Sequence, residues 1–133
     1  MPRLDLTRAL MAELAAVMRV PDLPQDPTGG YRLTVGPDTE VLVYGGDDVF
    51  VLMVVPIRTL PLEPEYGVMN WLLHGNMFNS DIAPFVVATD EAGMLILWGR
   101  LRIADFDGTT LARLIDNLAD RAVKMRTEIG EAR

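Results

Sequence analysis

Cysteine is absent from this sequence, and histidine occurs once, as His74. Disulfides, thiol catalysis and cysteine-ligated zinc are therefore excluded, and neither a histidine-based metal cluster nor a Cys–His pair can form. Long apolar runs are also absent: Val49–Val55 and Met94–Trp98 fall far short of the roughly 20 residues that a membrane-spanning helix needs. The N-terminus shows no basic region followed by an apolar stretch, so it predicts no signal peptide. We therefore expect a cytoplasmic protein that does not insert into a membrane.

Positive charge is scarce as well. The chain has 19 acidic and 12 basic residues, a net charge of −7, and its only lysine is Lys124. Because phosphate binding needs a basic surface, we expect no nucleic-acid partner. The acidic residues are spread along the chain, where they serve solubility or attract a basic partner segment. No group of residues predicts a metal or a cofactor.

Apolar residues, in contrast, make up 50% of the 133 residues, which is enough for one domain, 1–133, with a core of its own. They recur at helical spacing in some segments and form short strand-like runs between turn residues in others. The predicted elements, in chain order, are a helix Leu4–Met18, strands Tyr31–Val35, Val41–Tyr44 and Phe50–Val55, a helix Tyr66–Asn76, strands Phe85–Thr89 and Met94–Arg100, and a helix from Asp107 to Glu128. The order α-β-β-β-α-β-β-α predicts an α+β fold with a five-stranded antiparallel sheet and three helices. Asp107 is the predicted N-cap of the last helix, and Gly130 the residue that follows it.

The predicted strands contain more apolar side chains than one buried face of a sheet would account for. Val49–Val55 and Met94–Trp98 are apolar at odd and even positions alike, whereas a sheet with one wet face alternates apolar and polar residues. Three helices can cover one face, so either a partner subunit or bound peptide covers part of the other, or both faces pack within the chain. The helix Tyr66–Asn76 is apolar nearly all round, which indicates burial or an interface. Its His74 is interpreted as a packing residue, or as a pH-sensitive group at a dimer seam.

One motif points towards an enzyme. Asp105-Phe106-Asp107-Gly108-Thr109-Thr110 resembles the D-x-D-G-T motif of haloacid-dehalogenase-like phosphatases, in which the first aspartate attacks phosphorus and the second is the general acid and base. Such enzymes need a parallel sheet, and the 23 residues after Thr110 are too few to build one. Stabilisation of a helix N-terminus by the carboxylates is the simpler interpretation. We therefore predict no enzymatic activity and keep the phosphatase as a remote alternative.

At the level of pattern, nearly the whole chain resembles the class I type III secretion chaperones, the Tir-chaperone family. Leu72-Leu73-His74-Gly75-Asn76-Met77 is similar to the family's Leu-Leu-x-x-Asn-apolar signature in its middle helix. The stretch from Phe85 to Asp90, through Gly93 to Trp98 and Leu101, is similar to its strand, acidic turn and second strand, which a long amphipathic helix follows. The resemblance implies a homodimeric chaperone associated with virulence, without catalytic activity or a cofactor.

The resemblance also implies a partner and two sets of site residues. Such a chaperone binds the N-terminal segment of a type III secreted effector and keeps it extended and competent for export. The implied effector-binding residues are Leu10, Leu14, Val17, Tyr31, Leu33, Val41 and Val43. The implied dimer interface contains Met69, Trp71, Leu72, Met77 and Trp98. A protein of the same fold that sequesters a regulator of the secretion system is the alternative, and the sequence does not separate the two.

Overall fold

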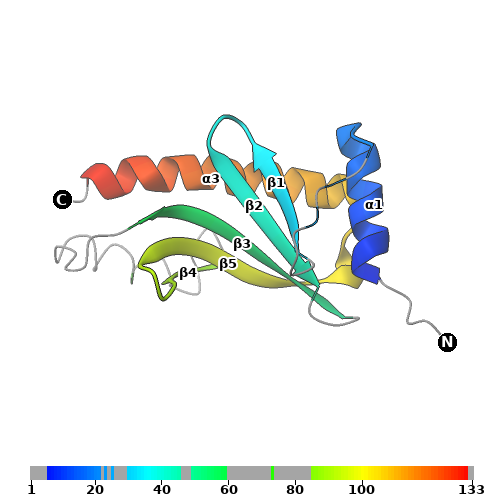
Figure 1. The fold of residues 1–133 in the computed structure, drawn as a ribbon, viewed down its shortest axis with the longest axis horizontal. Coiled ribbons are helices and arrows are strands. Elements are labelled where there is room, and N and C mark those ends of the chain that lie inside the picture. The colour runs from blue at the N-terminus through cyan, green and yellow to red at the C-terminus, as the bar shows by residue number, and fades with distance from the viewer. Residues whose placement is uncertain are drawn as a thin grey trace.

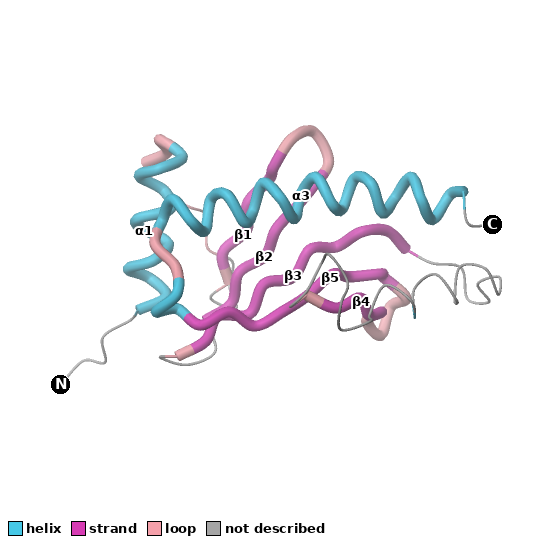
Figure 2. Tube along the Cα trace, turned by 180° about the vertical axis from the view of Figure 1, so that it is seen from behind, coloured by secondary structure: helices cyan, strands magenta, loops and turns pink. Residues whose placement is uncertain are grey.

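The computed structural model describes residues 6–21, 23, 25, 30–45, 49–59, 73 and 85–131 of the chain. These residues form a five-stranded sheet with strand order β1-β2-β3-β5-β4, in which all neighbouring strands are antiparallel. Helix α3 runs along one side of the sheet, and α1 stands at one end of the molecule, where it packs against the first part of α3 (Figures 1 and 2). The elements are α1 (Leu6–Met18), β1 (Tyr31–Val35), β2 (Thr39–Gly45), β3 (Phe50–Thr59), β4 (Val86–Thr89), β5 (Met94–Arg102), the 3-10 turn η1 (Ile103–Asp105) and α3 (Gly108–Glu131). The predicted α+β class and the antiparallel five-stranded sheet are confirmed.

Within the described residues there are two α-helices, where the sequence predicts three. The predicted middle helix, Tyr66–Asn76, lies outside the described residues apart from Leu73, whose side chain is 70% exposed. The coarser prediction, helices packed on an antiparallel sheet, is therefore the part that the structure supports.

Helix α1 buries one face and ends at a left-handed residue. Its buried residues are Thr7, Leu10, Met11, Leu14 and Ala15, spaced as one helical face. Arg19 follows the helix with φ of 59°. The Arg19 N–H donates to the Ala16 carbonyl at 3.3 Å and the Val20 N–H to the Ala15 carbonyl at 3.1 Å, which together form a Schellman motif. This motif satisfies two carbonyls at the end of the helix and turns the chain away from the helix axis.

Helix α3 begins at the cap that the sequence predicts. The Oδ1 atom of Asp107 accepts the backbone N–H of Thr110 at 2.8 Å, so Asp107 is confirmed as the N-cap. Gly108 then lies so close to α1 that a Cβ atom there would be 2.6 Å from the carbonyl carbon and oxygen of Glu13. The prediction for the other end is wrong, because α3 continues to Glu131 and Gly130 lies within it.

Strand β3 continues past the position where the sequence ends it. The predicted end before Pro56 is wrong: β3 runs on to Thr59 and pairs with β5 along this length, with a register shift between Pro56 and Arg58. Arg126 of α3 lies against this part of the strand. Its Nε donates to the Ile57 carbonyl at 2.8 Å and its Nη2 to the Pro56 carbonyl at 3.3 Å. Two carbonyls at the irregular part of the strand thus gain a charged donor.

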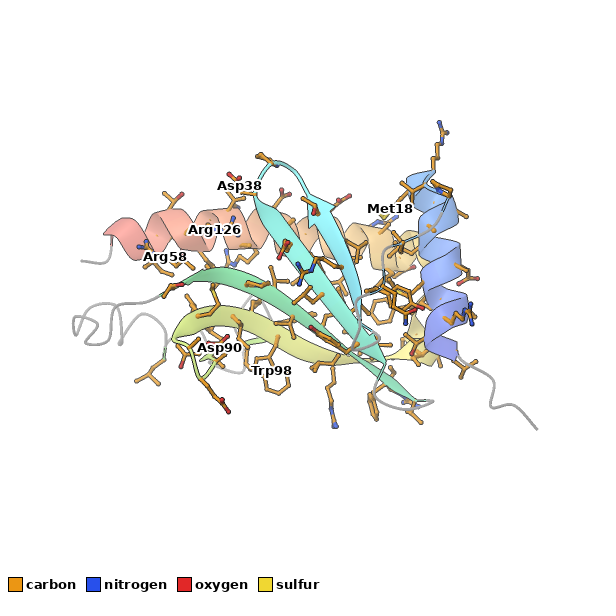
Figure 3. The ribbon with its side chains drawn as sticks, in the orientation of Figure 1. Met18, Asp38, Arg58, Asp90, Trp98 and Arg126 are labelled. Carbon is orange, nitrogen blue, oxygen red and sulfur yellow. The ribbon has the colours of Figure 1, made fainter. Side chains whose placement is uncertain are left out.

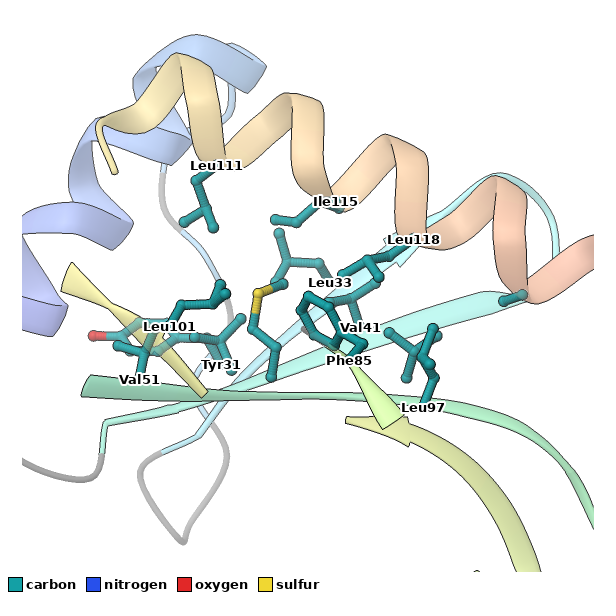
Figure 4. Close-up of a cluster of buried hydrophobic side chains, with 14 of the residues drawn as sticks. Tyr31, Leu33, Val41, Val51, Phe85, Leu97, Leu101, Leu111, Ile115 and Leu118 are labelled. Carbon is teal, nitrogen blue, oxygen red and sulfur yellow. The ribbon is translucent and has the colours of Figure 1, made fainter. Parts of the chain in front are cut away.

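The core lies between the helices and the inner face of the sheet. Side chains of α3, among them Leu111, Ile115 and Leu118, point towards Leu33, Val41 and Leu97 of the strands (Figure 4). Phe85 belongs to the same cluster and lies over Gly99 of β5, where a Cβ atom would be 2.9 Å from its ring. The strands alternate between buried inner positions and half-buried or exposed outer positions. The two faces of the sheet are therefore chemically distinct, and both contain apolar residues.

Candidate functional site: the outer face of the sheet

The outer face is the surface of the sheet opposite α1 and α3. Its centre is a row of four side chains that lie directly opposite one another on neighbouring strands. Leu42 of β2 pairs with Val54 of β3, Val54 with Trp98 of β5, and Trp98 with Val86 of β4. All four are half-buried, and Figure 3 shows Trp98 on the side of β5 that faces away from α3. We call these residues the apolar row.

Further apolar side chains flank the apolar row on both sides. Tyr44 and Leu52 pair on one side of it, and Ile96 and Ala88 on the other. All of them are half-buried as well. Cross-strand neighbours on one face lie about 5 Å apart, so the row and its flanks form one continuous surface. Contiguous apolar surface of this kind is typical of protein–protein contact sites.

The effector-binding residues that the family resemblance implies lie elsewhere. Six of them, Leu10, Leu14, Tyr31, Leu33, Val41 and Val43, are buried in the core with exposures of 0–9%. Only Val17 is accessible, with 44% of its surface exposed. In this structure the six therefore cannot form a surface that a partner touches, because α1, α3 and the inner face of the sheet already cover them. Their direct role in effector binding stays a prediction that the geometry does not favour.

The implied dimer residues can be placed only in part. Met69, Trp71, Leu72 and Met77 lie outside the described residues, and so does His74. Trp98 belongs to the apolar row, on an accessible surface as a contact residue requires. Leu42, Val54, Ile96 and Val86 were missed as site residues. The sequence contains no signal that separates them, because each stands beside an equally apolar inner residue.

Positive charge gathers at one end of the outer face. The guanidinium of Arg100 lies 4.8 Å from the centroid of the Phe50 ring, a cation–π contact. Arg102 pairs across the strands with Phe50, and both arginines are exposed. At the β1 edge, Arg32 and Glu40 form an exposed ion pair of 3.7 Å. We call Phe50, Arg100 and Arg102 the arginine corner.

The D-x-D-G-T stretch is explained by its structural roles. Asp107 caps α3 through Thr110, and the hydrogen bonds from Thr110 hold the pKa of Asp107 below its ordinary value. Gly108 provides the close crossing of α1 and α3. Asp105 lies in η1 with an exposed side chain, after the last strand of an antiparallel sheet. The motif thus serves to start α3, and its resemblance to the phosphatase motif stops at the residue types.

Three other kinds of site were considered in the described part of the chain: a metal site, a membrane-spanning helix and a pocket. No three His, Asp or Glu side chains gather there as a metal site, and no described helix is long and apolar enough to cross a membrane. An open pocket of about 350 Å³ lies beside Arg126, lined also by Asp38, Glu40 and Met94. Arg126 already donates to the carbonyls of Pro56 and Ile57 and to the hydroxyl of Thr39, so its guanidinium group is hydrogen-bonded within the chain.

The fold is similar to solved structures of secretion chaperones and chaperone–effector complexes. A chain of the complex between the Yersinia pestis type III secretion chaperone SycH and a fragment of YscM2 matches with a TM-score of 0.71 and 21% identity, over 88% of this chain and 97% of that one. A chain of the heterodimeric ExoU–SpcU complex of Pseudomonas aeruginosa matches with 0.71 and 28%, over 89% and 95%. A chain of the HopA1–SchA chaperone–effector complex matches with 0.72 and 14%, over 92% and 94%.

At the sequence level, no curated protein matches the chain. The profile of the Tir chaperone protein (CesT) family, however, matches residues 9–126. This match runs from the first turn of α1 almost to the end of α3, so it includes every described strand and the whole outer face. The chain therefore belongs to the Tir chaperone protein (CesT) family.

Proposed function

We propose that this chain is a homodimeric chaperone that binds the N-terminal segment of a type III secreted effector and keeps it extended until export. One observation carries the proposal: the described helices pack on the inner face of the sheet, while the outer face is apolar and its side chains are partly exposed. Family membership supports it, as do a type III secretion chaperone and a chaperone–effector complex among the similar structures. The proposal includes a single domain without catalytic activity that acts in the bacterial cytoplasm.

The outer face suits an extended guest for a geometric reason. Outer side chains on one strand repeat every second residue, as do the side chains on one face of an extended peptide. Complete burial of one Val or Leu side chain contributes about 1.5–3 kcal/mol, and half-buried residues such as Leu42 and Val54 retain part of that amount. Several such contacts can offset the cost of ordering a flexible segment, which is a few kcal/mol.

The two sides of the outer face have different proposed roles. We assign β4 and the part of β5 that pairs with it, up to Trp98, to the seam between two subunits, and the β2–β3 side, with Leu42 and Val54, to the guest. Strands β1 and β4 form the edges of the sheet, where a guest can also add a strand. The bridge between Gln25 and Tyr31 occupies the first residue of β1, so strand addition at β1 would begin beyond Tyr31.

Copurification tests the proposal with a matched pair of variants. The tagged chain is expressed in its host, and the proteins that accompany it are identified by mass spectrometry. We expect a secreted effector encoded nearby, held through its N-terminal segment and lost when that segment is deleted. Val54→Asp should abolish its capture, because a carboxylate would be buried in the apolar row. Val123→Asp on α3, where the valine is 54% exposed, should leave capture unchanged.

The outcomes separate binding from folding. Circular dichroism must show that Val54→Asp is folded, and Val54→Ser serves in its place if it is not. Capture that survives both changes at Val54, or that Val123→Asp reduces equally, would contradict the assignment to the outer face. A captured regulator of secretion in place of an effector would replace the export role with a regulatory one.

A further inference from the structure

The charge of the strands is opposite to the charge of the whole chain. The described strands contain four arginines, Arg32, Arg58, Arg100 and Arg102, and one acidic residue, Glu40. The chain as a whole carries −7. Net charge alone predicts attraction to a basic partner segment, whereas the surface that carries the apolar row is locally basic. The charge that a guest meets therefore differs from the charge that the composition suggests.

The arginine corner is placed and oriented to receive an anion. Arg100 and Arg102 are two residues apart on β5, so their side chains leave the same face of the sheet about 7 Å apart. The Phe50 ring holds the guanidinium of Arg100 from one side and leaves the N–H groups at its rim free to donate. Within the described part of the chain, neither arginine forms an ion pair with a carboxylate. Arg32, in contrast, is paired with Glu40.

Screening decides which charges matter to a guest on this face. At physiological salt the Debye length is about 8 Å, so exposed charges farther away contribute little. The two arginines lie within this distance of each other, and Arg100 lies opposite Leu52, which flanks the apolar row. A guest carboxylate at the corner would feel both cations, while charges more than a Debye length away would contribute little.

We propose that the outer face recognises an extended segment whose apolar side chains, at alternate positions, are followed by acidic residues that bind Arg100 and Arg102. The inference rests on the proposed function and adds to it the chemistry of the guest. The apolar part lies along β3, and the acidic end reaches the arginine corner. A two-fold contact centred on the corner would bring arginines against arginines, so a second copy of this chain would not be held there by its charge.

Two synthetic peptides test this chemistry. Both have leucine alternating with serine; one ends in two glutamates and the other in two lysines, and each carries a fluorophore for anisotropy measurements at about 0.15 M salt. We expect the glutamate peptide to bind about tenfold more tightly to the full-length protein. In the double variant Arg100→Glu with Arg102→Glu, the preference should reverse. The variant Arg113→Glu with Lys124→Glu, which changes two exposed cations of α3 by the same total charge, should keep the original preference.

Each outcome has a defined meaning. Equal binding of both peptides, or a preference that the two double variants change alike, would overturn the acidic-guest inference and leave the proposed function intact. Binding of neither peptide would overturn both the inference and the use of the outer face for a guest. The oligomeric mass of the Arg100→Glu, Arg102→Glu variant should equal that of the wild type. A changed mass would assign the corner to the contact between copies and overturn the inference.

Discussion

Asp107 links a single hydrogen bond to the pH dependence of stability. The Thr110 backbone N–H, followed by the Thr110 hydroxyl, lowers the pKa of Asp107 from its ordinary 3.8. A lowered folded-state pKa means that the ionised carboxylate stabilises the fold above the unfolded value and loses this effect as the pH falls through the folded value. Asp107→Ala should therefore lower the midpoint of thermal unfolding at pH 7, and the difference should shrink at pH values below about 3.8.

Circular dichroism melts over a pH series measure this effect, and two variants serve as controls. Asp107→Asn should lose less than Asp107→Ala, because asparagine is also a good N-cap. Asp105→Ala should change little, since Asp105 is exposed in η1 and does not cap α3. Equal effects of the Asp105 and Asp107 substitutions would contradict the capping role.

Arg126 makes a contact between α3 and the sheet that a smaller cation cannot reproduce. Besides Pro56 and Ile57, its Nη1 donates to the hydroxyl of Thr39 at 3.0 Å, and Thr39 is 2% exposed. Hydrogen bonds from a charged donor contribute about 1.5–3 kcal/mol each, but the open pocket beside Arg126 lets water replace part of them. We expect Arg126→Ala to lower the free energy of unfolding by about 2 kcal/mol.

Urea denaturation measures this change, with two comparisons. Arg126→Lys should recover about half of the loss, because the ammonium group cannot reach both strand carbonyls and Thr39 in the planar fork geometry. Lys124→Ala, an exposed position on the same helix, should stay within about 0.5 kcal/mol of the wild type. An Arg126→Ala protein as stable as the Lys124→Ala protein would disprove the contact.

Between elements, the crossing of α1 and α3 depends on a missing side chain. Replacing glycine by alanine in a helix usually adds about 1 kcal/mol of stability. At Gly108 the new Cβ atom would meet the backbone of Glu13 at 2.6 Å, and backbone cannot rotate away as a side chain can. We expect Gly108→Ala to cost about 2 kcal/mol by moving α1. Urea unfolding measures it, and Thr109→Ala, one residue further on and exposed, should be nearly neutral.

The sequence predicts the order of the described elements well, because turn residues separate the strands and Asp107 marks the start of α3. It fails at β3 for a physical reason. Pro56 lacks an N–H, which usually ends a strand. Here Arg126, 70 residues later in the chain, donates a hydrogen bond to the Pro56 carbonyl, and β3 keeps pairing with β5 beyond Pro56. Such a long-range contact has no local signature in the sequence.

For the candidate site, alternation shows that the strands have two faces but not which one the helices cover. Val41 and Val43 of β2 carry the same kind of side chain as Leu42 between them, so the sequence alone cannot rank them. The long helix α3 settles the question by packing on Val41 and its neighbours. The arginine corner was also missed, because Phe50 and Arg100 are far apart in the sequence and meet only through strand pairing.

At the scale of the whole molecule, the proposed homodimer can be tested by its mass in solution. If Trp98 contributes to a seam between subunits, light scattering should give a mass about twice the 14.7 kDa of the chain. Large aromatic residues at the centre of an interface often cost about 2 kcal/mol of binding when truncated, so Trp98→Ala should weaken dimerisation strongly. Val123→Ala, on the exposed side of α3, is the control. A monomer at all accessible concentrations would refute the dimer.

The alternation along β3 has a consequence for selectivity. Its outer positions Phe50, Leu52 and Val54 recur about every 7 Å. A peptide lying along them would be selected by the spacing of its bulky side chains and not by which residues carry them. Ligands with unrelated sequences but the same rhythm of bulky groups should then displace one another. Inserting one residue in the middle of such a ligand should turn half of its bulky groups away and release it, whereas inserting two should restore the rhythm.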